Sequence, residues 1–326
     1  MAAIFEGRRK GVEMTESLHI LFLIIVFPGF LFTGCLGLVA SWIVRKVSAL
    51  VQWRIGPPFF QPFYDVTKLM GKEILVPQQA QRAVFIGAPL VALSGVLLLS
   101  TMLWRTAISQ SAFVGDIIVA IYLMVLPSLA LILGSSASAS PHASVGTGRE
   151  MKLVMGYELP LVLAFIVVVI KTGGQLNLAA IAQQAPALSI SGMLAFLVAL
   201  LCVQAKLGFV PFDIAEAETE LGSGVLMEYS GALLAVWKLT QAMMLVALPM
   251  FLVTVFLGGF GPGFVSWLKG LGWYVLVIVF VILIKNTNPR MRIDQAMKFF
   301  WFYCGIALVA AIILAIAGNY YTINWL

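Results

Sequence analysis

The sequence predicts an all-α fold: a polytopic membrane protein with about eight transmembrane helices and amphipathic interfacial helices on the cytoplasmic side. Of its 326 residues, 61% are hydrophobic and only 10% are charged, whereas soluble domains average about 25% charged residues. The mean hydropathy of +1.03 is typical of helices that are apolar on all sides. Acidic side chains concentrated between residues 213 and 228 are costly beside hydrocarbon, which indicates that they have a use.

Long apolar segments define the spans, because a helix needs about 20 apolar residues to cross hydrocarbon. Eight segments qualify, at about 18–44, 83–104, 114–138, 154–171, 191–210, 225–257, 270–285 and 299–318. The sixth is long enough to be tilted or broken, whereas the seventh is short. Residues 1–17 are expected to form an N-terminal extension, in a chain that starts at Met1 or Met14, and residues 18–326 a single integral membrane domain.

Basic residues are distributed unevenly over the loops between these spans. The first, third, fifth and seventh loops hold most of them, Lys206 included, whereas the even-numbered loops and their borders hold only Arg105, Lys171 and Lys269. The positive-inside rule therefore places the first set in the cytoplasm and both termini outside, in a cell (plasma) inner membrane. Three basic residues at positions 8–10 oppose this orientation but are outnumbered.

The first loop predicts a short surface helix. Its Gly-Pro-Pro segment, residues 56–58, breaks the chain, and Pro62 suits the first turn of a new helix. Asp65, Lys68 and Lys72 then fall on one face, with apolar residues on another, as in a helix that lies at the membrane surface. Two interpretations stay open: an anchor with an internal Asp65–Lys68 ion pair, or a docking surface for another protein.

The fourth predicted span carries Glu158 just inside its start. Pro160 lacks a backbone N–H and clashes with the carbonyl of Gly156, which predicts a kink that admits water. One interpretation is an ion pair between Glu158 and Arg149 or Lys152. We favour a hydrated proton relay, because carboxylates within membranes are usually functional.

The acidic stretch of the fifth loop has a local explanation for only two of its members. Asp213 and Glu216 fit a capping box at a helix start. Glu218, Glu220 and Glu228 have no such explanation. A helix here would place Asp213, Glu216 and Glu220 on one face and Glu218 on another. Crowded carboxylates are partly protonated near neutral pH, which is what a proton path requires.

The seventh loop precedes the last span. Pro289 keeps Asn288 out of the helical conformation, and Asp294 is expected to cap the last span. Arg290 and Arg292 have three open interpretations: they neutralise the acidic stretch, bind an acidic partner, or only set the orientation.

The sequence offers no ligand set for a cofactor. Cys35, Cys202 and Cys304 are far apart in apolar segments, which predicts buried, inert thiols rather than iron–sulfur or zinc ligands. Only His19 and His142 are available for a bis-histidine site, and no phosphate loop or dinucleotide fingerprint occurs. The expected environment is a lipid bilayer, without a nucleic-acid partner.

Together, the loop motifs resemble the membrane "heel" subunit of respiratory complex I, the H subunit of bacterial NADH:quinone oxidoreductases, which also occurs in energy-converting membrane-bound hydrogenases. Five motifs carry the resemblance: Arg54-Ile-Gly-Pro with Gln61-Pro and Asp65-x-x-Lys68-Leu-x-x-Lys72-Glu73; Tyr157-Glu158-Leu-Pro160; Pro211-Phe-Asp213 through Glu220-Leu; Glu228-Tyr-Ser-Gly231; and Arg290-x-Arg292-x-Asp294-Gln295. The short join between Pro58 and Gln61, and the sequence Gly148-Arg149-Glu150, look like the ferredoxin-linked [NiFe] hydrogenase branch and its sulfur-reducing relatives.

The resemblance implies a non-catalytic membrane anchor and coupling subunit of a hydrogenase-like oxidoreductase complex. Such a subunit links electron transfer in a peripheral arm to translocation of H+ or Na+. Its expected partners are hydrogenase-like large and small peripheral subunits, an iron–sulfur subunit and antiporter-like membrane subunits. The [NiFe] and iron–sulfur centres would belong to those partners, and this chain would hold none.

The resemblance also assigns residues. The ion-coupling residues would be Glu158, Asp213, Glu216, Glu218, Glu220 and Glu228. The residues that dock the peripheral arm would be Arg54, Asp65, Lys68, Lys72, Glu73, Arg149, Arg290, Arg292 and Asp294. The alternative is the heel subunit of a quinone-reducing NADH or ferredoxin dehydrogenase, or of a sulfur-reducing relative. A free-standing transporter is disfavoured, because the two halves show no inverted repeat.

Overall fold

The computed structural model describes residues 21–111, 115–216, 222, 224–261, 263–321, 323 and 325. Every regular element within these ranges is helical, which confirms the predicted fold class. The predicted N-terminal extension, Glu218 and Glu220 lie outside the described residues.

Seven helical segments in the described ranges are long and apolar enough to span a membrane. They are Leu21–Val51, which includes α2 (Phe30–Val51); α4 (Arg82–Ser109); α5 (Asp116–Ser136); α6 (Pro141–Lys171); α10 (Gly231–Phe256); α11 (Phe264–Thr287); and Ile293–Tyr320, which includes α12 (Ile293–Lys298), a π-helical segment (Phe299–Cys304) and α13 (Gly305–Tyr320). A bent pair, Leu178–Leu188 and Ile190–Lys206, makes an eighth if it is one span. The prediction of about eight spans is confirmed.

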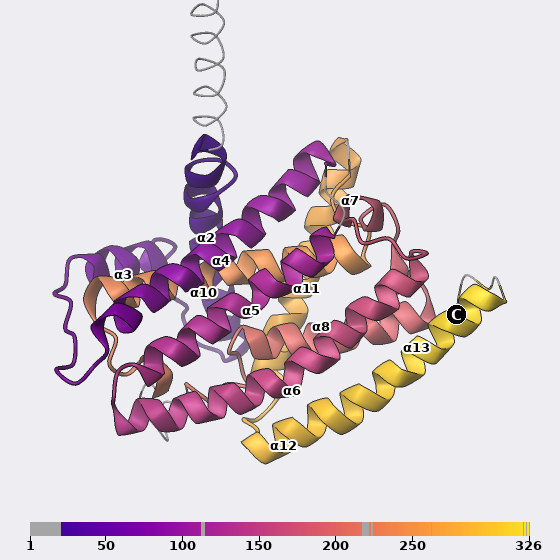
Figure 1. Cartoon of the computed structure of the whole chain (residues 1–326). Coiled ribbons are helices and arrows are strands. Elements are labelled where there is room, and N and C mark those ends of the chain that lie inside the picture. Colours follow the sequence, from indigo (N-terminus) through magenta and orange to yellow (C-terminus); the bar gives the residue numbers. More distant parts are fainter. Residues whose placement is uncertain are drawn as a thin grey trace, which may run out of the picture.

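The most buried span is α10: 94% of its apolar window is buried inside the protein, against 28% for α11. Helices α2, α4, α8 (Ile190–Lys206) and α11 all contact α10. Figure 1 shows α4, α5, α6 and α13 running side by side at a similar tilt, whereas α2 and α11 stand at a steep angle to them. Beyond Gln241, α10 is apolar on nearly all sides, so burial within the bundle is the arrangement that suits this part of it.

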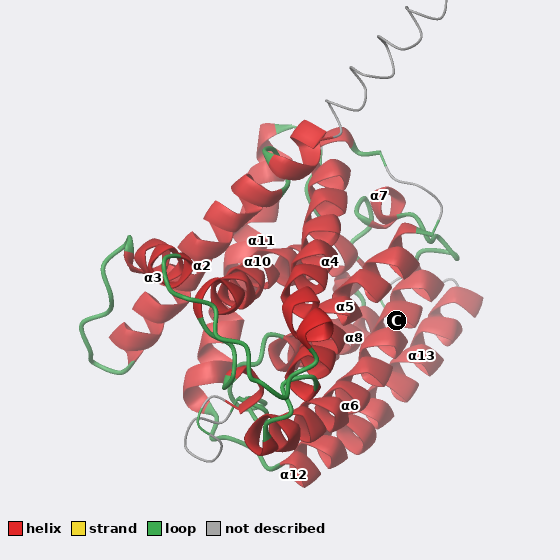
Figure 2. Cartoon of the chain, turned by 60° about the vertical axis from the view of Figure 1, so that its left-hand side comes forward, coloured by secondary structure: helices red, strands yellow, loops and turns green. Residues whose placement is uncertain are grey.

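The predicted surface helix is present as α3 (Gln61–Met70), with Pro62 in its first turn. Its buried residues, Pro62 and Val66, share one face, and α3 packs against α2 and α10 while Lys68 stays exposed. Figure 2 shows loop segments between α3 and α12, at the end of the bundle away from α7 (Leu178–Ile181). The amphipathic prediction is therefore confirmed.

Several helix ends differ from the predicted spans. Helix α6 begins at Pro141, well before the predicted 154, because polar residues such as Glu150 lower the hydropathy without preventing backbone hydrogen bonds. Helix α8 (Ile190–Lys206) is short and follows α7 and the 3-10 turn Pro186–Leu188 after a bend of 105°. Helix α11 is longer than predicted at both ends.

Two local predictions are wrong. The residue before α12 is Arg292, whose backbone N–H donates to the side-chain oxygen of Gln295 at 3.2 Å. Asp294 instead lies within the first turn of α12, where the helix dipole favours a negative charge. Cys35 is exposed on α2 rather than buried, since an apolar sequence does not distinguish a lipid-facing surface from the core.

Candidate functional site

A buried ion pair joins α6 to the end of α8. The ammonium Nζ of Lys206 lies 3.0 Å from Oε2 of Glu158, and the Lys206 side chain is 0% exposed. The same ammonium donates to the carbonyl of Met124 on α5 at 3.1 Å and lies 5.1 Å from the ring centroid of Tyr157. The phenol of Tyr157 is within 3.2 Å of the hydroxyl of Ser128. Three helices therefore enclose one lysine and its counter-ion.

This partner shows that the ion-pair interpretation of Glu158 named the wrong cation, whereas the proton relay stays a prediction. Neither Arg149 nor Lys152 binds Glu158; Lys206, predicted to lie in a cytoplasmic loop, does. Helix α6 continues without interruption through Pro160. Glu158 lies 17 residues after the start of α6, which corresponds to about 26 Å along the helix. Because α8 ends at Lys206, the chain leaves its helix deep inside the bundle, where a lysine needs a buried partner.

Part of the hydrogen-bonding capacity of Glu158 stays unused. Its Oε1 atom is buried and accepts no hydrogen bond from any described residue. A buried carboxylate normally has both oxygens satisfied, and an ion pair in a low-dielectric setting is stable only when the remaining lone pairs are bonded. The Glu158 carboxylate can therefore accept a water molecule or a proton in addition to Lys206.

The acidic stretch begins as loop and turn rather than as a helix. Asp213 pairs with Arg290 at 3.0 Å, which confirms that Arg290 neutralises this stretch. Glu216 accepts a hydrogen bond from the amide of Gln241 at 3.0 Å, and Lys238 donates to the Gln241 oxygen at 3.4 Å. Residues 213–216 are not helical, so the predicted capping box is wrong, and so is the expectation that Asp213 and Glu216 share a helical face.

Glu228 stands apart from the other predicted coupling residues. It lines neither of the two cavities described below. Its neighbour Tyr229 is anchored by a ring stack on Phe85 at 4.3 Å and donates to the Phe85 carbonyl at 3.2 Å. Burial raises the pKa of Tyr229 to about 12, so that its phenol stays a hydrogen-bond donor.

A small cavity connects the acidic stretch to the buried ion pair. Its volume is about 50 Å³, and a cavity of about 10–15 Å³ on this measure already holds one water molecule. Its polar and charged lining residues are Ser128, Glu150, Lys206, Asp213, Glu216, Thr240 and Gln241. These groups supply the several partners that a buried water needs. The structure thus brings Asp213 and Glu216 to the cavity lined by Lys206, the partner of Glu158.

A larger cavity of about 470 Å³ lies between α2, α3 and α10. It shares Leu207, Gly208, Glu216 and Gln241 with the small cavity. Glu216 and Gln241, which are hydrogen-bonded to each other, therefore form part of the wall between the two spaces. On the other side of this wall lies the small cavity, which Lys206 also lines.

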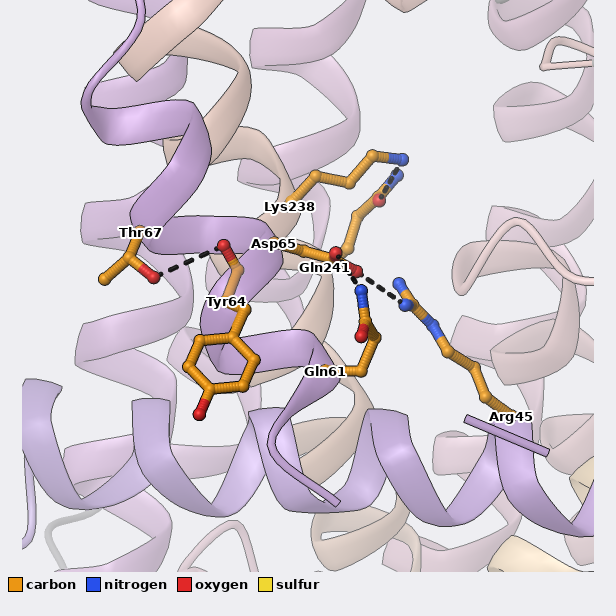
Figure 3. A network of polar contacts seen from close by, with 7 residues as sticks. All are labelled: Arg45, Gln61, Tyr64, Asp65, Thr67, Lys238 and Gln241. Carbon is orange, nitrogen blue, oxygen red and sulfur yellow. Dashed lines mark hydrogen bonds and ion pairs between the residues drawn. The ribbon is translucent and has the colours of Figure 1, made fainter. Parts of the chain in front are cut away.

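The predicted docking residues are mostly on the surface. Asp65 does not pair with Lys68; it binds Arg45 at 2.9 Å and the amide of Gln61 at 2.9 Å (Figure 3). Arg149 is half-buried and donates to the Ile214 carbonyl at 3.5 Å, so it braces the acidic stretch. The exposed members are Arg54, Lys68, Lys72, Glu73, Arg290, Arg292 and Asp294. Whether they contact another protein stays a prediction.

Four residues of these networks were missed in the sequence: Arg45, Glu150, Lys206 and Gln241. Arg45 and Lys206 read as orientation charges at the ends of spans. Glu150 precedes the predicted start of its span, although the helix already contains it. A signal for Gln241 was available, because Lys238 and Gln241 are polar residues within an apolar span and face the same side at a spacing of three.

Comparison with known proteins agrees with the resemblance carried by the loop motifs. The family model described as NADH dehydrogenase matches residues 21–316. The H subunit of the NADH-quinone oxidoreductase of Syntrophotalea carbinolica is 34% identical over 313 residues, covering 88% of this chain and 93% of that protein. The corresponding protein of Geobacillus thermodenitrificans is 34% identical over 272 residues, covering 79% of this chain and 82% of that protein.

A solved structure matches as well. A chain of the membrane-bound sulfane sulfur reductase, an archaeal respiratory membrane complex, superimposes with a TM-score of 0.79 at 27% identity. The match covers 94% of this chain and 99% of that chain. The described helices therefore have the arrangement of a known respiratory membrane protein. On the family model and these relatives, the chain belongs to the NADH dehydrogenase family of membrane proteins, which includes the H subunit of NADH-quinone oxidoreductases.

Proposed function

We propose that this chain is the coupling subunit of a complex I-like assembly, in which it links electron transfer in peripheral subunits to translocation of H+ or Na+. The observation that carries the proposal is the small cavity that joins Asp213 and Glu216 to the buried Lys206–Glu158 pair. The curated relatives are named as subunits of an oxidoreductase, and the structural neighbour is part of a respiratory membrane complex, which supports the same role.

The chemistry of the path follows from its charges. Lys206 is held between a carboxylate and a carbonyl, with the water-sized cavity beside it. A proton that reaches Glu158 neutralises the counter-ion of Lys206. The Lys206 ammonium is then attracted mainly to the carboxylates that line the cavity, which are Glu150, Asp213 and Glu216. A redox event that moves the acidic stretch would change this balance. Charge movement at the loop is thereby coupled to the interior of the bundle.

The experiment is neutralisation of the path in the assembled complex. Glu158→Gln and Glu216→Gln are each reconstituted with all partner subunits into vesicles, and ion uptake and electron-transfer rate are measured together. We expect ion uptake to fall by about tenfold or more, the scale of removing one charged hydrogen-bonding group, with the complex still assembled. Lys152→Gln, an exposed charge on the same helix α6, is the matched control. Normal ion uptake in both glutamate variants would refute the proposal.

The partners and their cofactors are part of this proposal. The short join between Pro58 and Gln61 favours peripheral subunits of the hydrogenase-like type, with [NiFe] or other redox centres and iron–sulfur clusters outside this chain. The sulfane sulfur reductase match favours the sulfur-reducing relative. Metal analysis of the gently purified complex tests it. Nickel with a hydrogenase-like large subunit would identify a hydrogenase, whereas a nickel-free homologue would indicate sulfur reduction.

A quinone-reducing complex is the second candidate, because the curated relatives at 34% identity are named as subunits of NADH-quinone oxidoreductases. It predicts quinone bound in the purified complex and sensitivity to quinone-site inhibitors. Absence of both would remove it. In either case the basic loops are expected on the cytoplasmic side, which labelling of single cysteines placed in those loops would test.

A further inference from the structure

The last helical segment is not α-helical throughout. Between α12 and α13, residues Phe299–Cys304 form a π-helical segment, and the backbone N–H of Gly305 donates to the carbonyl of Phe300, five residues before it. Such turns are rare and occur frequently at functional sites. Figure 1 shows α12, this segment and α13 as one continuous helix, which packs against α6. The π-helical segment therefore widens the helix without interrupting it.

The wider turn sets which side chains of this helix point into the protein. Within residues 296–308, the buried side chains are Ala296, Phe300, Cys304 and Leu308, which recur at every fourth position. In a regular α-helix of 3.6 residues per turn, this spacing would rotate Leu308 by about 120° away from Ala296. The π-helical segment absorbs that rotation and keeps all four side chains on one face. Residues 301–303, which follow Phe300, are exposed on the other side.

Phe300 lies between two aromatic rings of the candidate site. Its ring centroid is 4.8 Å from that of Phe212 and 6.2 Å from that of Tyr157, which it meets edge to face. All three side chains are buried. Phe212 directly precedes Asp213 in the chain, and Tyr157 directly precedes Glu158. One apolar ring therefore contacts the neighbours of two predicted coupling carboxylates that belong to different parts of the chain.

The loop before α12 holds the same part of the chain by polar contacts. Arg290 pairs with Asp213 at 3.0 Å, and the backbone N–H of Met291 donates to the carbonyl of Pro211 at 3.0 Å. With the ring contact on Phe212, the last helix and its preceding loop contact three consecutive residues where the acidic stretch begins. The ion pair responds to protonation, whereas the ring contact does not depend on charge. The apolar contact can therefore hold the stretch in place while its charge changes.

We propose that Phe300 is a positioning residue of the candidate site: its ring holds the acidic stretch against α6, so that Asp213 and Glu158 keep the arrangement that couples them. This role rests on the coupling function proposed above. The packing around the ring is tight, because a Cβ atom on Gly156 would lie 2.9 Å from Sδ of Met297 and 3.8 Å from Cδ2 of Phe300. The last span thus acts on the ion path through an apolar contact, without supplying a charge to it.

The test compares Phe300→Leu, which loses the ring, with Phe300→Tyr, which keeps it, in the assembled complex. Two quantities are measured: hydrogen–deuterium exchange of the backbone amides of residues 207–216, and the number of ions taken up by vesicles per electron transferred. A smaller amount of folded complex lowers both rates together and leaves this ratio unchanged. In Phe300→Leu we expect faster exchange and a ratio lower by about two- to tenfold, the range that a lost aromatic pair covers. Phe300→Tyr should keep the wild-type ratio.

Phe302→Leu is the matched control, because it removes an exposed ring from the same π-helical segment and should change neither quantity. If Phe300→Leu does not assemble, Phe300→Met, which adapts its shape to the same space, takes its place. Wild-type exchange in the variant without the ring would overturn the positioning role, as would a ratio in Phe300→Tyr as low as in Phe300→Leu.

Glu158→Gln, measured alongside, separates this inference from the coupling function. A loss of ion uptake in Glu158→Gln together with a wild-type ratio in Phe300→Leu would refute the positioning role and leave the coupling function standing. Normal uptake in both Glu158→Gln and Glu216→Gln would refute the coupling function, and the positioning role would fall with it.

Discussion

Gln241 donates a hydrogen bond to Glu216 at 3.0 Å across the wall that separates the two cavities. The same amide accepts a hydrogen bond from Lys238 at 3.4 Å. The neutral Gln241 side chain therefore bridges an ammonium group and a carboxylate by two hydrogen bonds. Among the described residues, Gln241 is the side chain that forms hydrogen bonds both to a lysine of the larger cavity and to the acidic stretch.

Replacement of this link is expected to impair transport without dismantling the protein. Gln241→Leu keeps the approximate volume but removes both hydrogen bonds, and a lost hydrogen bond to a charged group costs about 1.5–3 kcal/mol. Ion uptake by reconstituted vesicles should fall by about tenfold or more. Gln52→Leu, on the exposed turn after α2, serves as the control. Uptake equal to that of this control would show that the link is dispensable.

The Lys206–Glu158 pair predicts a strongly non-additive effect on stability. Lys206→Met strands a buried carboxylate and should lower the free energy of unfolding by about 3–5 kcal/mol. Lys206→Met combined with Glu158→Gln removes both charges and should recover most of that loss, although transport stays absent. Denaturation of the purified complex, followed by a probe of this chain, compares the three proteins. Equal losses in the single and double variants would contradict the ion pair.

Charge reversal on α3 distinguishes docking from anchoring. If Lys68 and Lys72 hold a peripheral subunit, Lys68→Glu/Lys72→Glu should release that subunit in mild detergent, because like charges then face each other across the interface. Subunit content after size-exclusion chromatography is the measurement, and Lys269→Glu is the control. An intact complex would favour the alternative in which α3 only anchors the chain at the membrane surface.

Close packing of α5 against Tyr229 predicts that two Gly→Ala substitutions, at Gly134 and at Gly87, differ in their effect on stability. A Cβ atom on Gly134 would overlap the Tyr229 hydroxyl and the Cβ of Ala88, whereas one on Gly87 would meet nothing within 4 Å. Gly134→Ala is therefore expected to cost about 1–3 kcal/mol of stability, the usual cost of overpacking. Gly87→Ala should cost nothing. Thermal denaturation midpoints of the two variants, measured side by side, check this difference.

Much of the molecule could be predicted from local sequence. The span prediction follows from hydropathy, because each apolar segment must satisfy its backbone hydrogen bonds within a helix wherever it sits in lipid. Pro62 and the apolar spacing after it predicted α3 correctly, since both act within one turn of helix. Helix ends were less accurate: α6 and α11 extend past their apolar segments, as polar side chains do not stop a helix.

By itself, the sequence determined a family, a helical membrane fold and a set of candidate acids, because composition and short motifs are properties of neighbouring residues. Only the tertiary structure decided partners: Glu158 with Lys206, Asp65 with Arg45, Asp213 with Arg290. Each of these pairs joins segments at least 20 residues apart. The pairing of charged residues depends on the depth at which each helix ends and on the direction in which its side chains point. The packing of the whole bundle sets this depth and this direction.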